Sequence, residues 1–424
     1  MKDPHPLGVS RTEAEVLAGC ELPVAGLFRG HESQNIGLIA SCIVDAYRGQ
    51  SLIQLGSARS LAVLAVDGLG YRVAARWLGP DVLIPLTATF PSTTTSALAT
   101  SLTGRTPSEH GVIGVQYLHT DGARGYNCIT GEITEPSSAG VIRPSPDPVT
   151  TTAFLALRDL GVRSFSLPGE LAALSAQWRK LALDGSTELA GSSGLDGSSG
   201  LAGSAGLVGS AGLDGQVPGS VPPGPPGMRG VHEVVDAVTR DLRAVLDRHR
   251  GALVWAYVNL DDHLHRYGPD HDIERACQAI DSLARALSAS GTAVLLYTDH
   301  GCAASCPSAA TMAAWDELSS PRTCRLPAGG AGRVRWLYPH AGAEQAVAHE
   351  LRTRLPDAVV TSPAELSRWG LVDADSIGYA RLGEIILLAR GPDFPVPEPE
   401  LAYEHGSMTV EEILVPLAVW QPTR

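Results

Sequence analysis

The 424-residue chain lacks any long apolar segment, because no run of about 18 apolar residues occurs in it. Its first residues, MKDPHPLGVSRTEAEVLAG, also lack a basic segment followed by an apolar core. The sequence therefore predicts neither a transmembrane helix nor a secretory signal peptide. From this pattern we expect a cytoplasmic protein.

Cysteine is scarce, and its seven copies are odd in number and mostly scattered along the chain. The disulfide framework of a secreted protein would favour an even number at regular spacings. Cys302 and Cys306 are close in sequence, but their spacing matches no specific metal-binding or redox motif. Reduced thiols are the simpler interpretation for all seven, namely Cys20, Cys42, Cys128, Cys277, Cys302, Cys306 and Cys324.

Positive charge is also limited: 32 Lys and Arg stand against 45 Asp and Glu, which gives a formal net charge of −13. A dedicated nucleic-acid-binding protein would normally carry a basic face, so we expect no nucleic-acid polymer as a partner. Hydrophobic residues make up 44% of the chain, which is enough for a substantial core and excludes wholesale disorder. The length allows two or three domains, or one large α/β domain with insertions.

Glycine and proline, by contrast, are abundant and unevenly distributed. The 46 glycines and 30 prolines make 18% of the chain, against about 12% in an average protein. From Gly191 to Gly215 every third residue is glycine, and a proline-rich stretch follows. The repeat itself contains no proline and is too short for a collagen triple helix. The expected organisation is a flexible Gly/Ser/Pro-rich insertion at 185–230, one main domain formed by 55–184 and 231–424, and an N-terminal segment, 1–54, that packs on the core.

Three short apolar segments, rich in β-branched residues and bounded by polar turns, are typical of buried parallel strands. They cover residues 60–70, 251–262 and 291–301. Amphipathic helices are predicted between them, at 231–250 and 272–290. This alternation indicates an α/β fold with a mostly parallel central sheet and helices on both faces. A further strand-like run at 380–390 belongs either to the same sheet or to a small antiparallel addition.

Each of the three predicted strands ends in an aspartate, Asp67, Asp261 or Asp299. Because ligands of open α/β sheets bind beyond the carboxyl ends of the strands, these carboxylates are expected to converge. His300 directly follows Asp299, and His265 lies one helical turn after Asp261. Carboxylate oxygens and imidazole nitrogens suit a pair of Zn²⁺ ions, or Mn²⁺ as a harder substitute. A single strand-end Asp is more often a helix cap or a turn former, so the metal site rests on the set.

Hydroxyl side chains directly precede a helix-like stretch in the segment ATFPSTTTSALATSLTGRTPSEHG, residues 88–111. Taken alone, such a Ser/Thr run is usually just a helix N-cap. The amino end of a helix also presents free N–H groups and a positive dipole end to an anion. Beside two metal ions, one of these hydroxyls would become an activated nucleophile.

In this order the motifs VDGLG, FPSTTTSALATSLTG, PSEHG, LDDHLHRYG, TDHG and EHGSMTVEEILVPL resemble the alkaline phosphatase superfamily. The similarity is to its type I phosphodiesterase/nucleotide pyrophosphatase branch, and it runs from about residue 60 to 420 apart from the glycine-rich insertion. The resemblance implies an alkaline phosphatase-like fold and two zinc ions held by three Asp and three His. It also implies a Thr or Ser that forms a covalent phospho-enzyme.

The resemblance distributes the metal ligands over two ions. One ion would be bound by Asp67, Asp299, His300 and the nucleophile. The other would be bound by Asp261, His265 and His405, of which the last was not visible to the strand-end argument. Thr409 to Glu412 reads as a capping box after a loop that could deliver the His405 imidazole.

The nucleophile of the family lies ten residues before the glycine that closes its helix. That glycine is Gly104 here, so the resemblance selects Thr94, with Thr93 and Thr95 as fallback choices. Two positions depart from the family pattern. Ala97 stands where many members place an Asn that steadies a phosphoryl oxygen, and Asn127 is the candidate replacement as a substrate-binding residue.

The second departure is Leu264, which stands in place of the usual small Gly before the metal-binding His and should change packing more than coordination. The implied function is a metal-dependent hydrolase that cleaves a phosphodiester or nucleotide pyrophosphate bond of a small metabolite through a phospho-threonine intermediate. A phosphomonoesterase on the same scaffold is the nearest alternative; it would need an Arg near the nucleophile, and Arg105 and Arg124 lie in that region. A non-catalytic binding or scaffold protein that retains the fold is the alternative of another class.

Overall fold

A mostly parallel sheet of seven strands forms the centre of the computed structural model, which describes residues 10–57, 59–148, 150–190 and 230–423. Strand β1 pairs in parallel with β8 and β9, and β6 in parallel with β8 and β7. Only β16 runs against its neighbours β2 and β9. In spatial order the strands are β2 (Val82–Thr87), β16 (Leu414–Trp420), β9 (Ala293–Thr298), β1 (Leu61–Asp67), β8 (Leu253–Asn259), β6 (Ser164–Leu167) and β7 (Thr187–Glu188).

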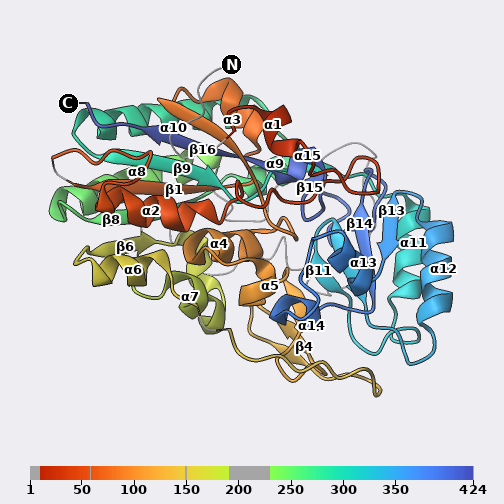
Figure 1. Cartoon of the computed structure of the whole chain (residues 1–424). Coiled ribbons are helices and arrows are strands. Elements are labelled where there is room, and N and C mark those ends of the chain that lie inside the picture. Colours follow the sequence, from red (N-terminus) through yellow and green to blue (C-terminus); the bar gives the residue numbers. More distant parts are fainter. Residues whose placement is uncertain (1–9, 58, 149, 191–229, 424) are drawn as a thin grey trace.

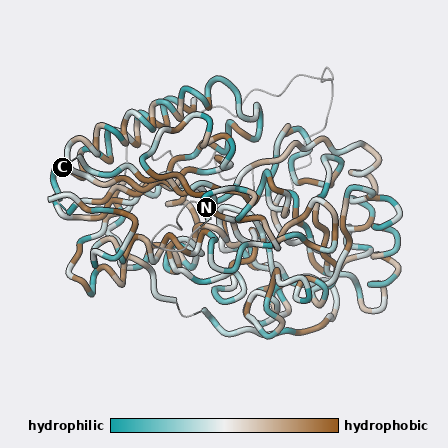
Figure 2. Tube along the Cα trace, turned by 45° about the horizontal axis from the view of Figure 1, so that its top comes forward, coloured by the Kyte–Doolittle hydropathy of each residue, from teal (hydrophilic) through white to brown (hydrophobic). Residues whose placement is uncertain are grey.

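The central sheet separates two apolar cores, one on each face. Val63 and Ala65 of β1 lie in one core, whereas Leu64 and Val66 lie in the other, because successive side chains of a strand point to opposite faces. All seven residues of β1 are buried, which explains its continuous apolar sequence. Figure 2 shows this arrangement as hydrophobic colour concentrated along the strands of the sheet.

Helices cover both faces of this sheet (Figure 1). The core on one face takes its helical side chains from α8 (Val231–Arg248) and α10 (His271–Ala289). The core on the other face takes them from α2 (Leu38–Arg48) and α4 (Thr94–Thr103) among others. The prediction of an α/β fold with helices on both faces is therefore confirmed.

A second sheet of seven strands is antiparallel throughout and lies to the right of the central sheet in Figure 1. Helices α11 (Ala309–Leu318) and α12 (Glu344–Arg354) pack on it and share a third apolar core with it. The strand-like run at 380–390 forms β14 of this sheet. Of its two predicted placements, the antiparallel sheet is therefore the correct one. In spatial order its strands are β13 (Ala358–Thr361), β14 (Ile385–Ala389), β12 (Val334–Leu337), β11 (Gly329–Ala331), β3 (Gln116–Leu118), β4 (Gly125–Asn127) and β5 (Ile133–Thr134).

The remaining elements are short and mostly connect or flank the two sheets. Strands β10 (Ala303–Ala304) and β15 (Tyr403–Glu404) form a separate antiparallel pair. The other helices are α1 (Glu13–Leu17), α3 (Tyr71–Trp77), α5 (Pro107–His110), α6 (Ala153–Asp159), η1 (Gly169–Ala173), α7 (Ala176–Leu183), α9 (Asp261–Tyr267), α13 (Pro363–Arg368), α14 (Ile377–Ala380) and α15 (Val410–Ile413).

The expected elements fall where the sequence placed them: β1, β8 and β9 lie within the three predicted strand segments, and α8 and α10 match the two predicted helices. Of the expected insertion at 185–230, the first residues include edge strand β7, which pairs with β6. The glycine repeat lies outside the described residues, so its flexibility stays a prediction. In the N-terminal segment, α2 places Ile39 and Ile43 in the core beside α4.

All seven cysteines are free thiols. Among the described residues, we find no helix with the length and apolar character that crossing a membrane requires. The cytoplasmic location stays a prediction from the sequence.

A buried ion pair connects the second sheet to the central one. Arg333 directly precedes β12, and its Nε lies 3.1 Å from Oε1 of Glu412 in α15, which leads into β16. The two side chains are 2% and 0% exposed. Oε1 of Glu412 also accepts from the backbone N–H of Ser407, and Oε2 accepts from the hydroxyl of Thr409 in the expected capping box. The pair thus fixes the loop between β15 and α15.

Breaking this pair from one side is expected to be costly, because it leaves a buried, unpaired carboxylate. Arg333→Met should lower the free energy of unfolding by about 3–5 kcal/mol. The matched control is Arg354→Met, which breaks a half-exposed pair with Glu317 at 2.8 Å and should cost less than about 1 kcal/mol. Urea unfolding followed by circular dichroism measures both, and equal losses would contradict the proposed role of the buried pair.

Candidate active site

Three buried aspartates meet at the carboxyl edge of the central sheet. Asp67 is the last residue of β1, Asp299 directly follows β9, and Asp261 begins α9 just after β8. They are at most 7% exposed. Because β9, β1 and β8 are neighbours in the sheet, the three carboxylates converge as the sequence predicted.

Three histidines approach the same place from different elements. His300 Nε2 lies 3.3 Å from Asp67 Oδ1, and His265 Nε2 in α9 lies 2.8 Å from Asp261 Oδ2. His405, in the loop that follows β15, places its Nε2 3.7 Å from the same Asp261 oxygen. All six predicted metal ligands are therefore brought together in one buried cluster.

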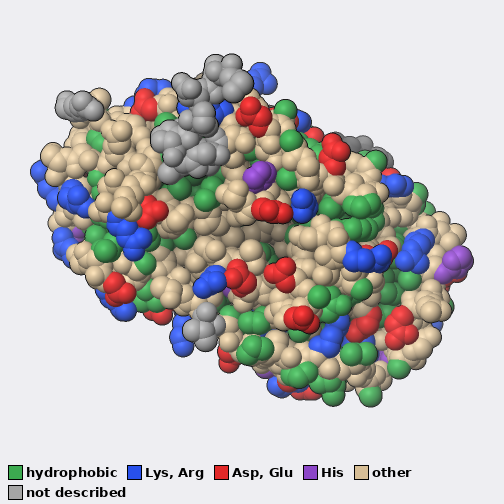
Figure 3. Space-filling model, viewed as in Figure 1, with side chains coloured by type: hydrophobic (Ala, Val, Ile, Leu, Met, Phe, Trp, Pro, Cys, Tyr) green, Lys and Arg blue, Asp and Glu red, His purple; other side chains and the backbone are tan. Residues whose placement is uncertain are grey.

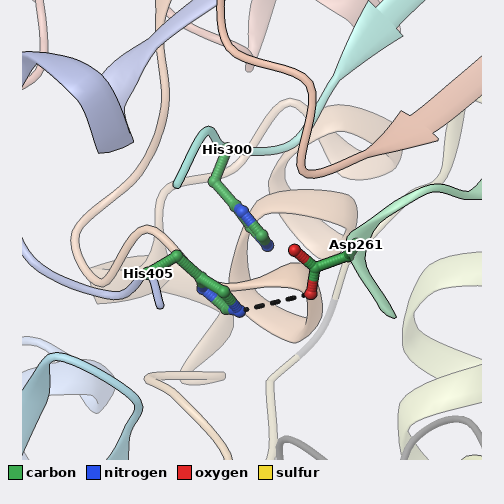
Figure 4. A group of neighbouring side chains, drawn as sticks. All are labelled: Asp261, His300 and His405. Carbon is green, nitrogen blue, oxygen red and sulfur yellow. Dashed lines mark ion pairs between the residues drawn. The ribbon is translucent and has the colours of Figure 1, made fainter. Parts of the chain in front are cut away.

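The ligand atoms fall into two overlapping groups. Asp67, Asp299 and His300 form one group, in which each side chain offers an atom within 4.8 Å of the others. Asp261, His300 and His405 form the second, and Figure 4 shows their side chains pointing toward one another. The rings of His300 and His405 stack with centroids 3.6 Å apart. The second group thus contains His300, whereas the resemblance assigned His265 in that place. His265 lies beside this group, paired with Asp261 and with its ring centroid 5.3 Å from that of His405.

The orientation of the imidazoles fits a cation between them and the carboxylates. In each ring Nδ1 faces a backbone carbonyl oxygen: Tyr403 O at 2.7 Å from His265, Gly301 O at 3.2 Å from His300, and Ser92 O at 2.9 Å from His405. A proton on Nδ1 satisfies these contacts, and in the neutral rings of His300 and His405 it leaves the Nε2 lone pair turned toward an anionic carboxylate.

Three atoms in this cluster, Asp67 Oδ1, Asp299 Oδ2 and His265 Nε2, form no regular hydrogen bond among the described residues, although each lies 2.8 to 3.6 Å from an oppositely charged or chargeable group. Buried polar atoms of native proteins are nearly always paired, so a missing partner needs an explanation. A divalent cation would give these oxygens and this nitrogen a common partner. The donor set therefore fits the metal ions that the resemblance implied.

The carboxylates oppose one another's ionisation. Burial raises the pKa of Asp67 well above its usual value, and the neighbouring Asp299 and Asp261 raise it further. Burial also raises the pKa of Asp299, against the effect of the nearby His300. Burial alone would raise the pKa of Asp261 too, but the imidazole of His265 holds it below its usual value. Three buried carboxylates in one place thus require compensating positive charge.

The imidazoles are perturbed in both directions. Burial lowers the pKa of His300 to about 4, and burial likewise lowers the pKa of His405 to about 4. Burial acts the same way on His265, but Asp261 and Glu404 raise its pKa well above the usual value. Two of the three rings are thus neutral near pH 7, which is the form that binds a metal ion.

Thr94 lies next to this cluster as the first residue of α4. Its hydroxyl donates to Asp67 Oδ2 at 3.4 Å, and its Oγ1 is 3.1 Å from His300 Nε2. The fallback hydroxyls are engaged elsewhere, since Thr93 donates to Ser96 Oγ at 3.2 Å and Thr95 to the Gly114 carbonyl at 3.1 Å. Of the three candidates, Thr94 has the hydroxyl that contacts the charged groups.

Comparison with known families identifies the chain. The family model "Type I phosphodiesterase / nucleotide pyrophosphatase" matches residues 75–391. The chain belongs to this family. Its members are phosphodiesterase- and pyrophosphatase-type hydrolases, so the chain is an enzyme of this type. This finding argues against the alternative of a non-catalytic binding or scaffold protein. No curated protein matches the chain.

Solved structures show the same fold at low sequence identity. Murine ectonucleotide pyrophosphatase/phosphodiesterase 5 is 14% identical, with a TM-score of 0.51 over 85% of this chain and 88% of that one. An inactive form of that protein was solved in complex with AMP. Phosphonoacetate hydrolase from Sinorhizobium meliloti 1021, in complex with phosphonoformate, is 17% identical, with a TM-score of 0.54 over 85% of this chain and 89% of that one.

The two positions that depart from the family pattern are both accounted for structurally. Ala97, a residue of α4, is fully buried in the core on one face of the central sheet. Leu264 is buried in the core on the opposite face. The side-chain oxygen of Asn127 accepts from the backbone N–H groups of Ile129 at 2.9 Å and Thr130 at 3.1 Å, so it fixes a turn after β4. Its role in substrate binding stays a prediction.

Several contacts of this cluster carried no signal in the sequence. Tyr257 of β8 donates a very short hydrogen bond to Asp67 Oδ2, and the Cys302 thiol donates to Asp261 Oδ1 at 3.3 Å. Glu404 lies 3.2 Å from Nδ1 of His265. Each comes from a residue distant in sequence from its partner, and nothing in the spacing links them. Only the family resemblance pointed to His405, through the motif that follows it.

A third group of potential ligands, His263, Asp270 and Asp272, lies in a half-exposed position. Its contacts are ordinary ones: His263 Nε2 is 3.0 Å from Asp270 Oδ1, which also caps the first turn of α10. His232 likewise pairs with Asp272 at 3.3 Å. These hydrogen bonds account for the group without a cation.

Removing divalent cations should destabilise the protein, because it leaves the three buried carboxylates uncompensated. Treatment with EDTA is expected to lower the melting temperature, and added Zn²⁺ or Mn²⁺ should restore it. A cation at about 100 times its Kd contributes about 2.7 kcal/mol to the stability of the native state. Differential scanning fluorimetry measures the shift. Asp299→Asn removes one of the carboxylates and should therefore reduce the change in melting temperature that EDTA causes. A wild-type melting temperature that EDTA does not change would contradict the cation site.

Proposed function

We propose that this enzyme cleaves a phosphodiester or nucleotide pyrophosphate bond of a small metabolite through a phospho-threonine intermediate on Thr94. The observation that carries the proposal is the position of the Thr94 hydroxyl, 3.4 Å from Asp67 Oδ2 and 3.1 Å from His300 Nε2. A hydroxyl in such surroundings is placed for nucleophilic attack. The fold shared with phosphoryl-transferring relatives supports the same chemistry.

Two divalent cations are part of the proposal, most simply Zn²⁺, with Mn²⁺ as the alternative. One would be held by Asp67, Asp299 and His300 together with Thr94. The other would be held by the remaining three ligands, Asp261, His265 and His405. When bound, such cations supply positive charge against the phosphoryl oxygens and favour the alkoxide form of a coordinated hydroxyl. The mixed oxygen and nitrogen donor set matches the preferences of Zn²⁺.

The protein's own groups orient the nucleophile and the phosphoryl group. The Thr94 hydroxyl proton points at Asp67, which leaves oxygen lone pairs free to attack phosphorus. Thr93, the N-cap of α4, makes no side-chain capping hydrogen bond, so the first-turn N–H groups of this ten-residue helix are available to an anionic phosphoryl group. These amides are candidates to replace the Asn that the family pattern has at position 97.

The proposed reaction consists of two successive displacements at phosphorus. In the first, Thr94 Oγ1 forms a bond to phosphorus while the bond to the leaving oxygen breaks, and the leaving group departs as an alcohol or phosphate. In the second, water attacks phospho-Thr94, releases the phosphorylated product and restores the hydroxyl. Both steps need in-line geometry, which the fixed start of α4 provides for the nucleophile.

A small anionic substrate is supported by the structural neighbours, whose solved complexes hold AMP and phosphonoformate. The face drawn in Figure 3 also offers no basic surface of the kind that a nucleic-acid polymer requires. Figure 3 shows basic and acidic side chains interspersed over the face drawn, without a broad basic patch.

The phosphomonoesterase alternative is less well supported. Arg105 Nη1 is 2.8 Å from Glu109, and Arg124 contacts Asp121 at 2.5 Å and Glu135 at 3.5 Å. Both arginines are thus paired with carboxylates. Within the described parts of the chain, no hydrogen bond or ion pair joins an arginine to Thr94, and a monoester needs such a charge for its additional anionic oxygen.

Replacing the nucleophile should abolish turnover. We expect Thr94→Ala to lower kcat on bis(p-nitrophenyl) phosphate by at least about 10³-fold, since no other hydroxyl takes its place. Thr95→Ala is the matched control, because its hydroxyl contacts the Gly114 carbonyl and the Cys128 thiol rather than the charged cluster, and it should retain most activity. Rapid quenching and mass spectrometry of the wild type should find phosphate on the peptide that contains Thr94. Near-wild-type turnover by Thr94→Ala would disprove the assignment.

Substrate preference separates the diester from the monoester function. With Zn²⁺ or Mn²⁺ added, kcat/KM for bis(p-nitrophenyl) phosphate should exceed that for p-nitrophenyl phosphate. Arg124→Ala should leave this ratio unchanged, because that side chain is engaged by Asp121 and Glu135. A higher kcat/KM for the monoester would instead establish the phosphomonoesterase alternative. A panel of nucleotide diphospho-conjugates would then identify the natural leaving group.

A further inference from the structure

Glu404 is a buried carboxylate that contacts one of the six cluster residues from behind. It is 2% exposed and ends strand β15. Its Oε1 lies 3.2 Å from Nδ1 of His265, the nitrogen that faces away from Asp261. The same nitrogen also lies 2.7 Å from the backbone oxygen of Tyr403. His265 is thus held between two consecutive residues of β15 on one side and Asp261 on the other.

The backbone around Glu404 is built to keep it in place. Strand β15 pairs with β10 so that Glu404 lies opposite Ala303, three residues after His300. On the other side lies Gly332, whose φ of +48° and lack of a side chain allow a close approach. A Cβ at residue 332 would lie 2.1 Å from Oε2 of Glu404. Any other residue there would displace the carboxylate.

Among the described residues Glu404 makes no ion pair other than that with His265, although the guanidinium of Arg335 lies near enough to attract it electrostatically. Oε2 of Glu404 has no hydrogen-bond partner in the parts of the chain that the structure describes, although the atom is buried. The nearby Arg333 is engaged by Glu412 at 3.1 Å. The Tyr403 carbonyl alone already suffices to hold the Nδ1 proton, just as Gly301 and Ser92 do for His300 and His405. Of these three rings, His265 therefore has a second acceptor at Nδ1, and this acceptor is anionic.

We propose that Glu404 is a positioning residue that makes His265 a stronger ligand for a divalent cation. A carboxylate behind a metal-binding imidazole fixes the ring and increases the basicity of the nitrogen that faces the metal. Its effect should be confined to the cation held by Asp261 and His265, because in the described parts of the chain Nδ1 of His300 faces the Gly301 carbonyl and no carboxylate. The inference rests on the proposed function in that it requires both cation sites.

The test is the affinity of the purified protein for Zn²⁺, measured by competition with a chromophoric chelator. Glu404→Gln keeps the size and the hydrogen-bond acceptor but removes the charge, and should weaken one of two binding steps about 10- to 100-fold. Glu404→Asp keeps the charge at a shorter reach and should lose less. A role in packing alone would reverse this order, because Gln matches the native size and Asp does not. The control is Glu400→Gln, which alters an exposed glutamate four residues away.

The outcomes separate the two levels of the proposal. If the wild type binds two Zn²⁺ and Glu404→Gln binds both equally well, with a native circular dichroism spectrum, the role of Glu404 is disproved while the proposed function stands. If the wild type binds no Zn²⁺ or Mn²⁺, the proposed function fails, and the inference fails with it. If Glu404→Gln does not fold, Glu404→Ala, which also removes the charge, takes its place: two native binding steps disprove the role, and a single weakened step supports it.

Discussion

The structure depends on a concentration of buried negative charge at one edge of its central sheet. Asp67, Asp261 and Asp299 lie within reach of one another, and burial raises the pKa of two of them. Such a cluster is unfavourable unless positive charge offsets it. The orientation of the three imidazoles, each with Nδ1 on a backbone carbonyl, leaves lone pairs rather than protons facing two of these carboxylates. A bound cation would offset the carboxylate charge and accept the imidazole lone pairs, which agrees with a metal-dependent hydrolase.

The second sheet matters to this site because it fixes the loop that carries His405. The ion pair between Arg333 and Glu412 joins the start of β12 to the helix before β16, and the backbone of Ser407 donates to the same carboxylate. His405 therefore lies in a loop held from both sheets, although it belongs to neither. The same surroundings bring Glu404 against His265, so the antiparallel sheet contributes to the site through the residues it positions.

The position of Thr94 links the fold to the proposed chemistry. Its helix begins at the edge where the carboxylates meet, so one residue supplies both a hydroxyl beside Asp67 and the first amide of a helix start that has no side-chain cap. A site with a fixed nucleophile and fixed N–H groups needs little rearrangement during phosphoryl transfer. Ala97 is compatible with this arrangement, because the helix start itself offers donors where other family members use an asparagine.

The sequence alone determined three adjacent strands of the central sheet, β9, β1 and β8, and the aspartates at their ends, because buried parallel strands have continuous apolar sequences and their carboxyl ends share one edge. It also indicated His265 and His300 by local spacing, and the family resemblance added Thr94 and His405. The extent of the antiparallel sheet was not predictable, since its strands are short and pair residues far apart, such as Gly330 with Gln116. The contacts of Tyr257, Cys302 and Glu404 likewise exist only once distant segments pack. Periodicity and spacing record what neighbours in sequence do, whereas the surroundings of each ligand were decided by the tertiary structure.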